Sequence, residues 1–183
     1  MILTDILPIL SFQPRTHDPQ LFTKPGLLKI SIITLGKTST PYIKAGIDVY
    51  LSRLKHYGKV ELIELSDINT KGISPDTLKQ KEGEAILKQV KADDVLVLLD
   101  EKGEQFSSRG FADFLQKKMN AGIKNLCLVV GGAFGFSSDV YARANAQLSL
   151  SKMTFTHEMV RLFICEQLYR AFTIQKGESY HND

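Results

Sequence analysis

The stretch LVVGGAFGFS, residues 128–137, joins an apolar run to three glycines within five residues. A buried strand that runs directly into glycines indicates a sharp turn or a close approach of the backbone to another group. The spacing excludes two known phosphate-binding loops. A dinucleotide-binding fingerprint needs glycines at i, i+2 and i+5, whereas they stand here at 131, 132 and 135. A P-loop ends in Gly-Lys-Ser/Thr, but Phe136 follows Gly135.

Two interpretations of this glycine turn remain open. In the first, backbone geometry alone requires the glycines. In the second, the turn is the wall of a pocket for a flat organic ligand, because Phe134 and Phe136 alternate with the glycines and offer apolar surface beside missing side chains.

The chain around this turn alternates strands and helices. Strands are predicted at residues 28–36, 59–65, 94–100, 125–132 and 146–151, and helices at 41–58, 74–90, 109–122, 137–145 and 157–174, with a polar turn at 101–107. Most of the core strands are continuously apolar, which is typical of strands buried on both faces. The order predicts one α/β domain with a largely parallel sheet over residues 28–183. Ligands of such domains bind beyond the carboxyl ends of the strands, which singles out the loops after Leu99, Val130 and Ser151.

Composition limits the class of protein. The 183 residues carry a net charge of +3, which permits RNA binding but does not by itself indicate it; an oligomer would concentrate that charge on one face. Cys127 and Cys165 stand in apolar segments, which predicts buried thiols and a reducing, cytoplasmic environment. No apolar run approaches the roughly 20 residues of a membrane span, so no membrane association is expected.

Residues 1–27 differ from the rest of the chain, since they hold four of the six prolines and show no helical or strand period. Asp5 and Pro8 interrupt the apolar part, and no positive charge precedes it, which argues against a signal peptide. We expect a poorly ordered extension that arises from the choice of start site. The alternative is a terminal segment that packs on a partner subunit.

The segment HEMVR, residues 157–161, begins like a zinc-protease motif. That motif needs a second histidine at i+4, and Arg161 stands there instead, so no metal site is expected. In the ordinary interpretation, His157 and Glu158 serve a helix N-terminus, where acidic residues are favoured. Arg161 and Arg170 lie on roughly opposite faces of the predicted helix, and the polar tail after it would ordinarily be frayed.

A set of segments spread along the chain resembles one known family. In order they are KISIITLGK, KEGEAIL, VLLDEKG, VVGGAFGF, LSLSKMTFTHEMVRLFICEQLYRAF and GESYH. Together they are similar to the bacterial ribosomal large-subunit pseudouridine methyltransferases of the SPOUT class. The resemblance covers about residues 28–181, and residues 1–27 are its main departure.

This resemblance implies a SPOUT-type parallel-sheet sandwich whose C-terminal part forms a trefoil knot. It also implies S-adenosylmethionine-dependent methylation of N-3 of a pseudouridine in 23S rRNA, by a homodimer in which the tail of one subunit reaches toward the cofactor of the other. Because the chain is small and has no separate RNA-binding domain, we expect the assembled ribosome to be the substrate. The alternatives are a SPOUT enzyme for another RNA site and a non-catalytic, ribosome-associated module that binds S-adenosylmethionine.

The resemblance also implies site residues. The expected cofactor-binding residues come from three loops: Leu99, Gly131, Gly132, Leu150, Ser151, Lys152, Met153, Thr154 and Phe155. The expected catalytic residues are His157, Arg161, Tyr180 and His181. N-3 must lose its proton to be methylated, and the candidates for the acceptor are His157, Glu158, Tyr180 and His181. The resemblance favours the tail pair, Tyr180 and His181, as part of the substrate pocket but does not assign the acceptor. Arg170 is expected either to bind RNA phosphate or to support the knot.

Overall fold

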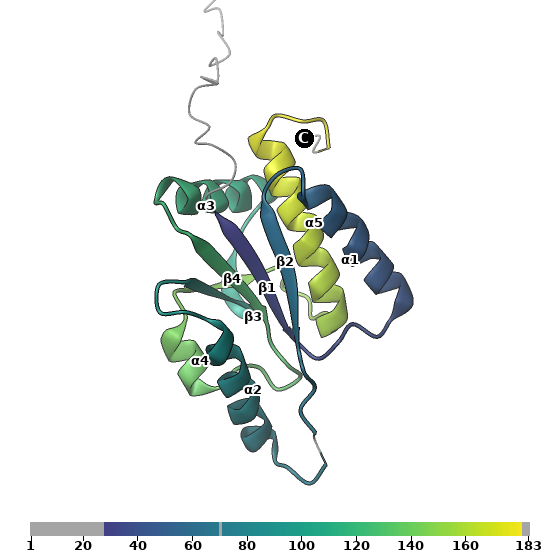
Figure 1. Ribbon diagram of the computed structural model, residues 1–183, viewed down its shortest axis with the longest axis vertical. Helices are drawn as coiled ribbons and strands as arrows, with labels where there is room; N and C mark the ends of the chain where they lie inside the picture. The colour runs from purple at the N-terminus through teal and green to yellow at the C-terminus, as the bar shows by residue number, and fades with distance from the viewer. Residues whose placement is uncertain (1–27, 70, 181–183) are drawn as a thin grey trace, which may run out of the picture.

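Continuous apolar strands form the centre of the molecule (Figure 1). The computed structural model describes residues 28–69 and 71–180, so the predicted extension at 1–27 and His181 lie outside the described residues. The described strands are β1 (Lys29–Leu35), β2 (Lys59–Leu65), β3 (Val95–Gln105), β4 (Asn125–Val130) and β5 (Ala146–Ser149). They form one sheet in the order β2-β1-β4-β3-β5, and every neighbouring pair is parallel. The predicted α/β domain with a parallel sheet is confirmed.

Helices cover both faces of this sheet (Figure 1). The described helices are α1 (Pro41–Leu54), α2 (Pro75–Gln89), α3 (Ser108–Asn120), α4 (Ser138–Arg143) and α5 (His157–Gln175). Helix α5 packs against both α1 and α3 on one face, and α2 and α4 pack together on the other. No helix in the described part of the chain is long and apolar enough to cross a membrane.

Local sequence signals start the helices. Pro41 and Pro75 occupy the first turns of α1 and α2. Proline lacks a backbone N–H, but an N–H at this position would have no hydrogen-bond partner within the helix, so nothing is lost. Four hydroxyl side chains accept a hydrogen bond from the backbone N–H three residues further on, which caps α2, α3, α4 and α5: Ser74, Ser107, Ser137 and Thr156.

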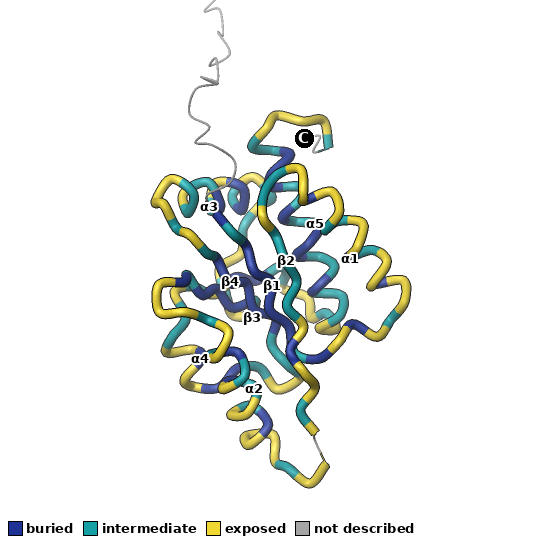
Figure 2. Tube along the Cα trace, in the orientation of Figure 1, coloured by how far each residue is buried: buried dark blue, intermediate teal, exposed yellow. Residues whose placement is uncertain are grey.

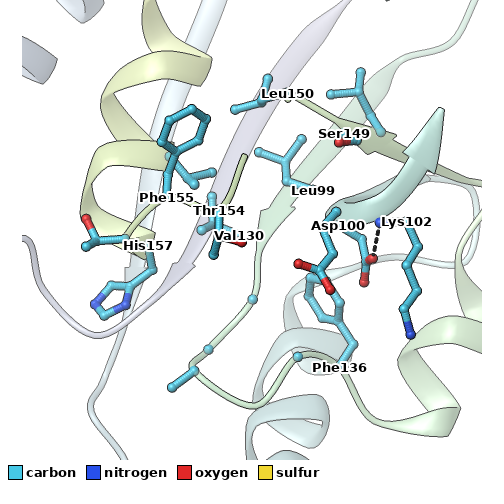
Figure 3. Close-up of a pocket in the computed structure, with 18 of the residues that line it drawn as sticks. Leu99, Asp100, Lys102, Val130, Phe136, Ser149, Leu150, Thr154, Phe155 and His157 are labelled. Carbon is cyan, nitrogen blue, oxygen red and sulfur yellow. Dashed lines mark hydrogen bonds between the residues drawn. The ribbon is translucent and has the colours of Figure 1, made fainter. Parts of the chain in front are cut away.

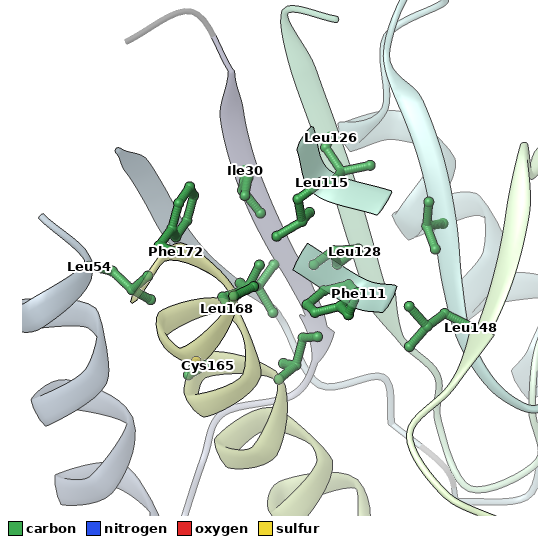
Figure 4. Packing of buried hydrophobic residues seen from close by; sticks show 14 of the residues in the cluster. Ile30, Leu54, Phe111, Leu115, Leu126, Leu128, Leu148, Cys165, Leu168 and Phe172 are labelled. Carbon is green, nitrogen blue, oxygen red and sulfur yellow. The ribbon is translucent and has the colours of Figure 1, made fainter. Parts of the chain in front are cut away.

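The core divides into two clusters, one on each face of the sheet. Figure 2 shows the buried residues along the central strands, and Figure 4 shows side chains of the cluster that faces α1, α3 and α5. In β4, Leu126 and Leu128 point toward α1, α3 and α5, whereas Cys127 and Val129 point toward α2 and α4. Because both faces are covered, these strands need apolar residues at every position, which explains their continuous hydrophobic runs. Cys127 and Cys165 are buried free thiols, as predicted.

Strand β3 is longer than the sequence predicts. The expectation of a turn at 101–107 is wrong for its first part, because Glu104 and Gln105 pair again with β5 after an irregular stretch. Leu99 and Glu104 both pair with Leu148, so the intervening residues wrap closely around β5. Gly103 permits this contact, since a Cβ at this position would lie 2.5 Å from the backbone nitrogen of Leu148.

We predict that Gly103→Ala destabilises the protein, because backbone atoms of β5 would have to move to accommodate the methyl group. A backbone clash of this kind costs about 1–3 kcal/mol. For a chain of this size the loss corresponds to a Tm lowered by roughly 2–12 °C in thermal unfolding. Gly58→Ala is the matched control, because its Cβ would meet only the Phe172 ring at an ordinary 3.7 Å. Equal Tm values for the two variants would contradict this account of Gly103.

Candidate functional site

A cavity of about 610 Å³ lies at the carboxyl ends of β3, β4 and β5 (Figure 3). Three segments far apart in the sequence line it: residues 99–102, residues 130–136, and the stretch that leads from β5 into α5. Leu99 and Val130 form the last pair between β3 and β4, so the first two segments begin where the pairing of these two strands ends. This is the edge at which parallel α/β domains hold ligands.

The structure brings most of the predicted cofactor-binding residues to this cavity. Eight of the nine line it: Leu99, Gly131, Gly132, Leu150, Ser151, Met153, Thr154 and Phe155. Lys152 lies in the same segment but is not among the lining residues. Figure 3 shows Leu150, Phe155 and His157 along the side of the cavity that leads into α5.

The glycines of the turn stand there for two different structural reasons. Gly135 has a φ of +76°, a conformation that favours glycine, and its N–H donates to the carbonyl of Gly132. Gly131 and Gly132 lie close to side chains instead: a Cβ on Gly131 would lie 3.0 Å from the Phe136 ring, and one on Gly132 would lie 2.6 Å from the Glu82 carboxylate, which would have to move. The turn is therefore enclosed by side chains on both sides.

The segment between β5 and α5 is shaped by its own hydroxyl groups. Ser149 Oγ donates to the carbonyl oxygen of Ser151 at 2.8 Å, and Ser151 Oγ accepts from the Met153 backbone N–H at 2.9 Å. The Phe155 ring packs edge-on against Phe163 of α5, with 4.9 Å between the ring centroids. These contacts leave the Met153 side chain 72% exposed beside the cavity.

His157 and Glu158 begin α5, but they have different environments. His157 lines the cavity. The Glu158 carboxylate turns away and accepts hydrogen bonds from the Ser39 N–H and hydroxyl, at 2.7 and 2.8 Å, and from the Thr40 N–H at 3.3 Å. Hydrogen bonds from Thr40 and Ser39 lower the pKa of Glu158 to about 2. Glu158 is therefore a structural anion that joins the start of α5 to the start of α1.

Arg161 does not reach the cavity. Its side chain is 1% exposed; Nη1 donates to Thr38 Oγ1 at 3.0 Å and Nη2 donates to the Leu35 carbonyl oxygen. Glu64 lies 3.8 Å from the guanidinium and also accepts from the Thr38 N–H and hydroxyl. These contacts fasten α5 to the carboxyl end of β1, which points to a structural role for Arg161.

Tyr180 lies at the opposite end of α5 from His157. Its hydroxyl donates to Glu166 at 3.1 Å, its ring packs on Tyr169 with centroids 4.7 Å apart, and the Arg170 guanidinium lies 4.8 Å from it. Helix α5 has 19 residues and is about 28 Å long, so one chain does not bring Tyr180 and His157 together. Arg170 also forms an ion pair with Glu166, and it supports the tail in this way.

One residue beside the site was not singled out from the sequence. Glu82 belongs to KEGEAIL, which reads as an ordinary charged helix, and only the fold shows that its carboxylate lies against Gly132. Among the described residues, no group of three or more His, Cys, Asp or Glu side chains is arranged to hold a metal ion.

Comparison with known proteins gives consistent matches. Residues 28–181 match the family described as "Predicted SPOUT methyltransferase". The protein named "Ribosomal RNA large subunit methyltransferase H" of Christiangramia forsetii is 51% identical over 156 residues, which are 85% of this chain and 99% of that relative. The protein of the same name from Flavobacterium psychrophilum gives the same identity and coverage. The one from Geotalea daltonii is 44% identical over 155 residues, 85% of this chain and all of the relative.

The environment of Glu158 predicts a pH dependence of stability. Its pKa is lower in the folded protein than in the unfolded chain, so its contribution is fully present above about pH 5 and is lost as the pH falls toward 2. We expect Glu158→Gln to lower the Tm at pH 7, and the difference from the wild type to disappear in this acidic range. Thermal unfolding of the wild type and of Glu158→Gln between pH 2 and pH 7 measures this difference in Tm. A Tm difference that does not change with pH would contradict the assignment.

Proposed function

Because the chain belongs to the SPOUT methyltransferase family, we propose that it methylates N-3 of a pseudouridine in 23S rRNA with S-adenosylmethionine as the methyl donor. The name shared by relatives that align over nearly their whole length supports the large ribosomal subunit as the substrate. The observation that carries the proposal is the convergence of three distant segments on one cavity at the carboxyl edge of the sheet.

The residues present fit S-adenosylmethionine. A cavity of about 610 Å³ is of the size that holds a small organic cofactor. Leu99, Leu150 and Phe155 supply apolar walls for a flat base, and the absent side chains of Gly131 and Gly132 leave room for close contact with the backbone. When bound, this cofactor supplies an electrophilic methyl group on a sulfonium.

The protein's part in methyl transfer is mainly alignment. A displacement at a methyl carbon requires the attacking nitrogen to be held close to that carbon and in line with its bond to sulfur. Rigid cavity walls therefore matter more than general acid catalysis. Of the predicted proton acceptors in the described chain, Glu158 is occupied by Ser39 and Thr40, and Tyr180 is at the far end of α5. His157 lies at the cavity wall, where it is placed to orient the incoming nucleotide.

A homodimer supplies the missing part of the site. The tail of one chain lies about 28 Å along α5 from that chain's own cavity, so a tail residue that contacts the substrate has to come from a second copy. Tyr180 is held by Glu166, Tyr169 and Arg170, which fixes the position of the described tail at the end of α5. A dimer also doubles the net charge of +3 and favours approach to RNA.

The path of the chain supports the trefoil knot implied by the family. Strand β5 is at the sheet edge beside β3, yet α5 packs between α1 and α3 and is fastened to the carboxyl end of β1. The segment after β5 therefore crosses the ends of β3 and β4, and it passes close to the residues that lead from β3 into α3. Assembled ribosomes in the cytoplasm are the proposed substrate, because folded RNA is recognised largely by its shape.

The first test combines gene deletion with a cavity-filling variant. Mass spectrometry of large-subunit rRNA from cells without the protein should show the loss of one methyl group on a pseudouridine. Wild type should restore it, whereas Gly131→Arg should not, because a side chain there meets the Phe136 ring and enters the cavity. Calorimetry should detect S-adenosylmethionine binding to the wild type and not to Gly131→Arg.

Ala121→Arg is the matched control, since it adds the same charge at an exposed turn at the opposite end of the sheet. We expect it to bind S-adenosylmethionine and to restore the methyl group. Cofactor binding without any change in the rRNA of the deleted strain would instead favour the non-catalytic module.

The second test addresses the composite site. Gly131→Arg subunits and subunits truncated after Gly177 should each be inactive alone. Random mixing should restore about a quarter of wild-type sites, because half of the dimers are mixed and each holds one intact combination of cavity and tail. The rate of methyl transfer to ribosomes by the mixture, compared with that of the wild type, measures the fraction of active sites restored. If mixing restores nothing although mixed dimers form, the tail does not act across the dimer.

A further inference from the structure

A second, smaller cavity lies behind the glycine turn. It has a volume of about 240 Å³ and is lined by the segment after β2, by Glu82 of α2, by residues 131–134 and by His157. The turn and His157 also line the large cavity, so the two cavities share a wall. That wall lacks side chains at Gly131 and Gly132.

Glu82 is the unusual group in this second cavity. Its two carboxylate oxygens would lie 2.6 and 2.7 Å from a Cβ on Gly132, so the carboxylate rests directly against the turn. Its Oε2 is buried and has no hydrogen-bond partner among the described residues. Burial raises the pKa of Glu82 above its ordinary value. The other ionisable groups that line the cavity are Asp67 and His157.

An unpaired, buried acceptor is costly to a folded protein unless a ligand satisfies it. The ring of a pseudouridine presents N-3–H between two carbonyl groups, and a carboxylate is the natural acceptor for that N–H. For methyl transfer the ring has to lie where the two cavities meet, beside His157, so that N-3 reaches Glu82 and also contacts the methyl carbon directly.

We propose that the second cavity receives the target base and that the Glu82 carboxylate accepts the proton from N-3. The inference rests on the proposed function, of which it names the base-binding subsite and the proton acceptor. The N-3–H bond breaks and its proton passes to Glu82, while the N-3 electron pair forms the bond to the methyl carbon. The carbon–sulfur bond breaks, its electron pair stays on sulfur as a neutral thioether, and Glu82 then releases the proton to water.

The test compares Glu82→Gln with Glu84→Gln, a matched change at an exposed position of the same helix. Single-turnover methylation of ribosomes that lack the modification should fall by about 10²–10⁴-fold at neutral pH in Glu82→Gln. Its residual rate should keep rising with pH, because only hydroxide then removes the N-3 proton, whereas the wild-type rate should level off. Glu84→Gln should match the wild type, and the Kd for S-adenosylmethionine should be unchanged in both variants.

A second readout needs no activity. Because its pKa is raised in the folded state, the Glu82 carboxylate lowers stability as the pH rises past its unfolded value. Without any cofactor, Glu82→Gln should have the same Tm as the wild type in acid and an equal or higher Tm at neutral pH. A structural role would give the reverse, a lower Tm.

Three results would overturn the assignment. They are a Glu82→Gln rate within about threefold of the wild type, a lowered Tm or failure to fold, and weakened binding of S-adenosylmethionine. A wild-type protein that methylates no large-subunit rRNA would instead refute the proposed function. In that case the Tm comparison would still report on the state of Glu82.

Discussion

The architecture depends on how the start of α5 is fastened to the end of β1. The Arg161 guanidinium is buried and donates to Thr38 and to the Leu35 carbonyl, with Glu64 close by. One turn earlier, Glu158 accepts hydrogen bonds from Ser39 and Thr40. A buried guanidinium without partners would destabilise the fold strongly, so these contacts of the two Nη atoms hold the start of α5 at the end of β1. These contacts fix the α5 end of the segment that leads from β5 into α5.

The cavity follows from that fixed end. The crossing segment is held at β5 by strand pairing and at α5 by the buried arginine, so residues 150–156 have to span the ends of β3 and β4. The glycine turn faces them, supported by the Phe136 ring on one side and by Glu82 on the other. Rigid elements thus hold all three lining segments, which suits a reaction whose rate depends on alignment.

Much of this arrangement could be predicted from the sequence. The bounds of β2 were predicted correctly, and those of β1 and β4 to within two residues, because burial on both faces gives an apolar run and glycine or polar residues end it. The three loops of the cavity follow from the rule that parallel strands present their carboxyl ends together. The extension of β3 could not be predicted, because EKGEQ is polar and pairs only with a short edge strand.

The roles of single polar residues were harder to predict. The sequence around a single arginine on a helix does not show whether its side chain binds RNA or the end of a strand. The role of Arg161 becomes clear only from its hydrogen bonds to Thr38 and Leu35, which lie more than 120 positions away. Glu82 is similar: its periodicity on α2 is that of an ordinary charged helix, and its unpaired state arises from a turn 50 positions later. Pairings of this kind depend on the fold as a whole rather than on a local pattern.

The glycine turn combines a local sequence signal with contacts that depend on the whole fold. Gly135 allows the chain to reverse, whereas a Cβ at Gly131 would press on the Phe136 ring and one at Gly132 would displace the Glu82 carboxylate. Residues 131–132 line both cavities and add no side-chain bulk to either. Methyl transfer needs the attacking nitrogen in direct contact with the methyl carbon. The base therefore has to reach the cofactor past the end of this wall, beside His157, rather than across it.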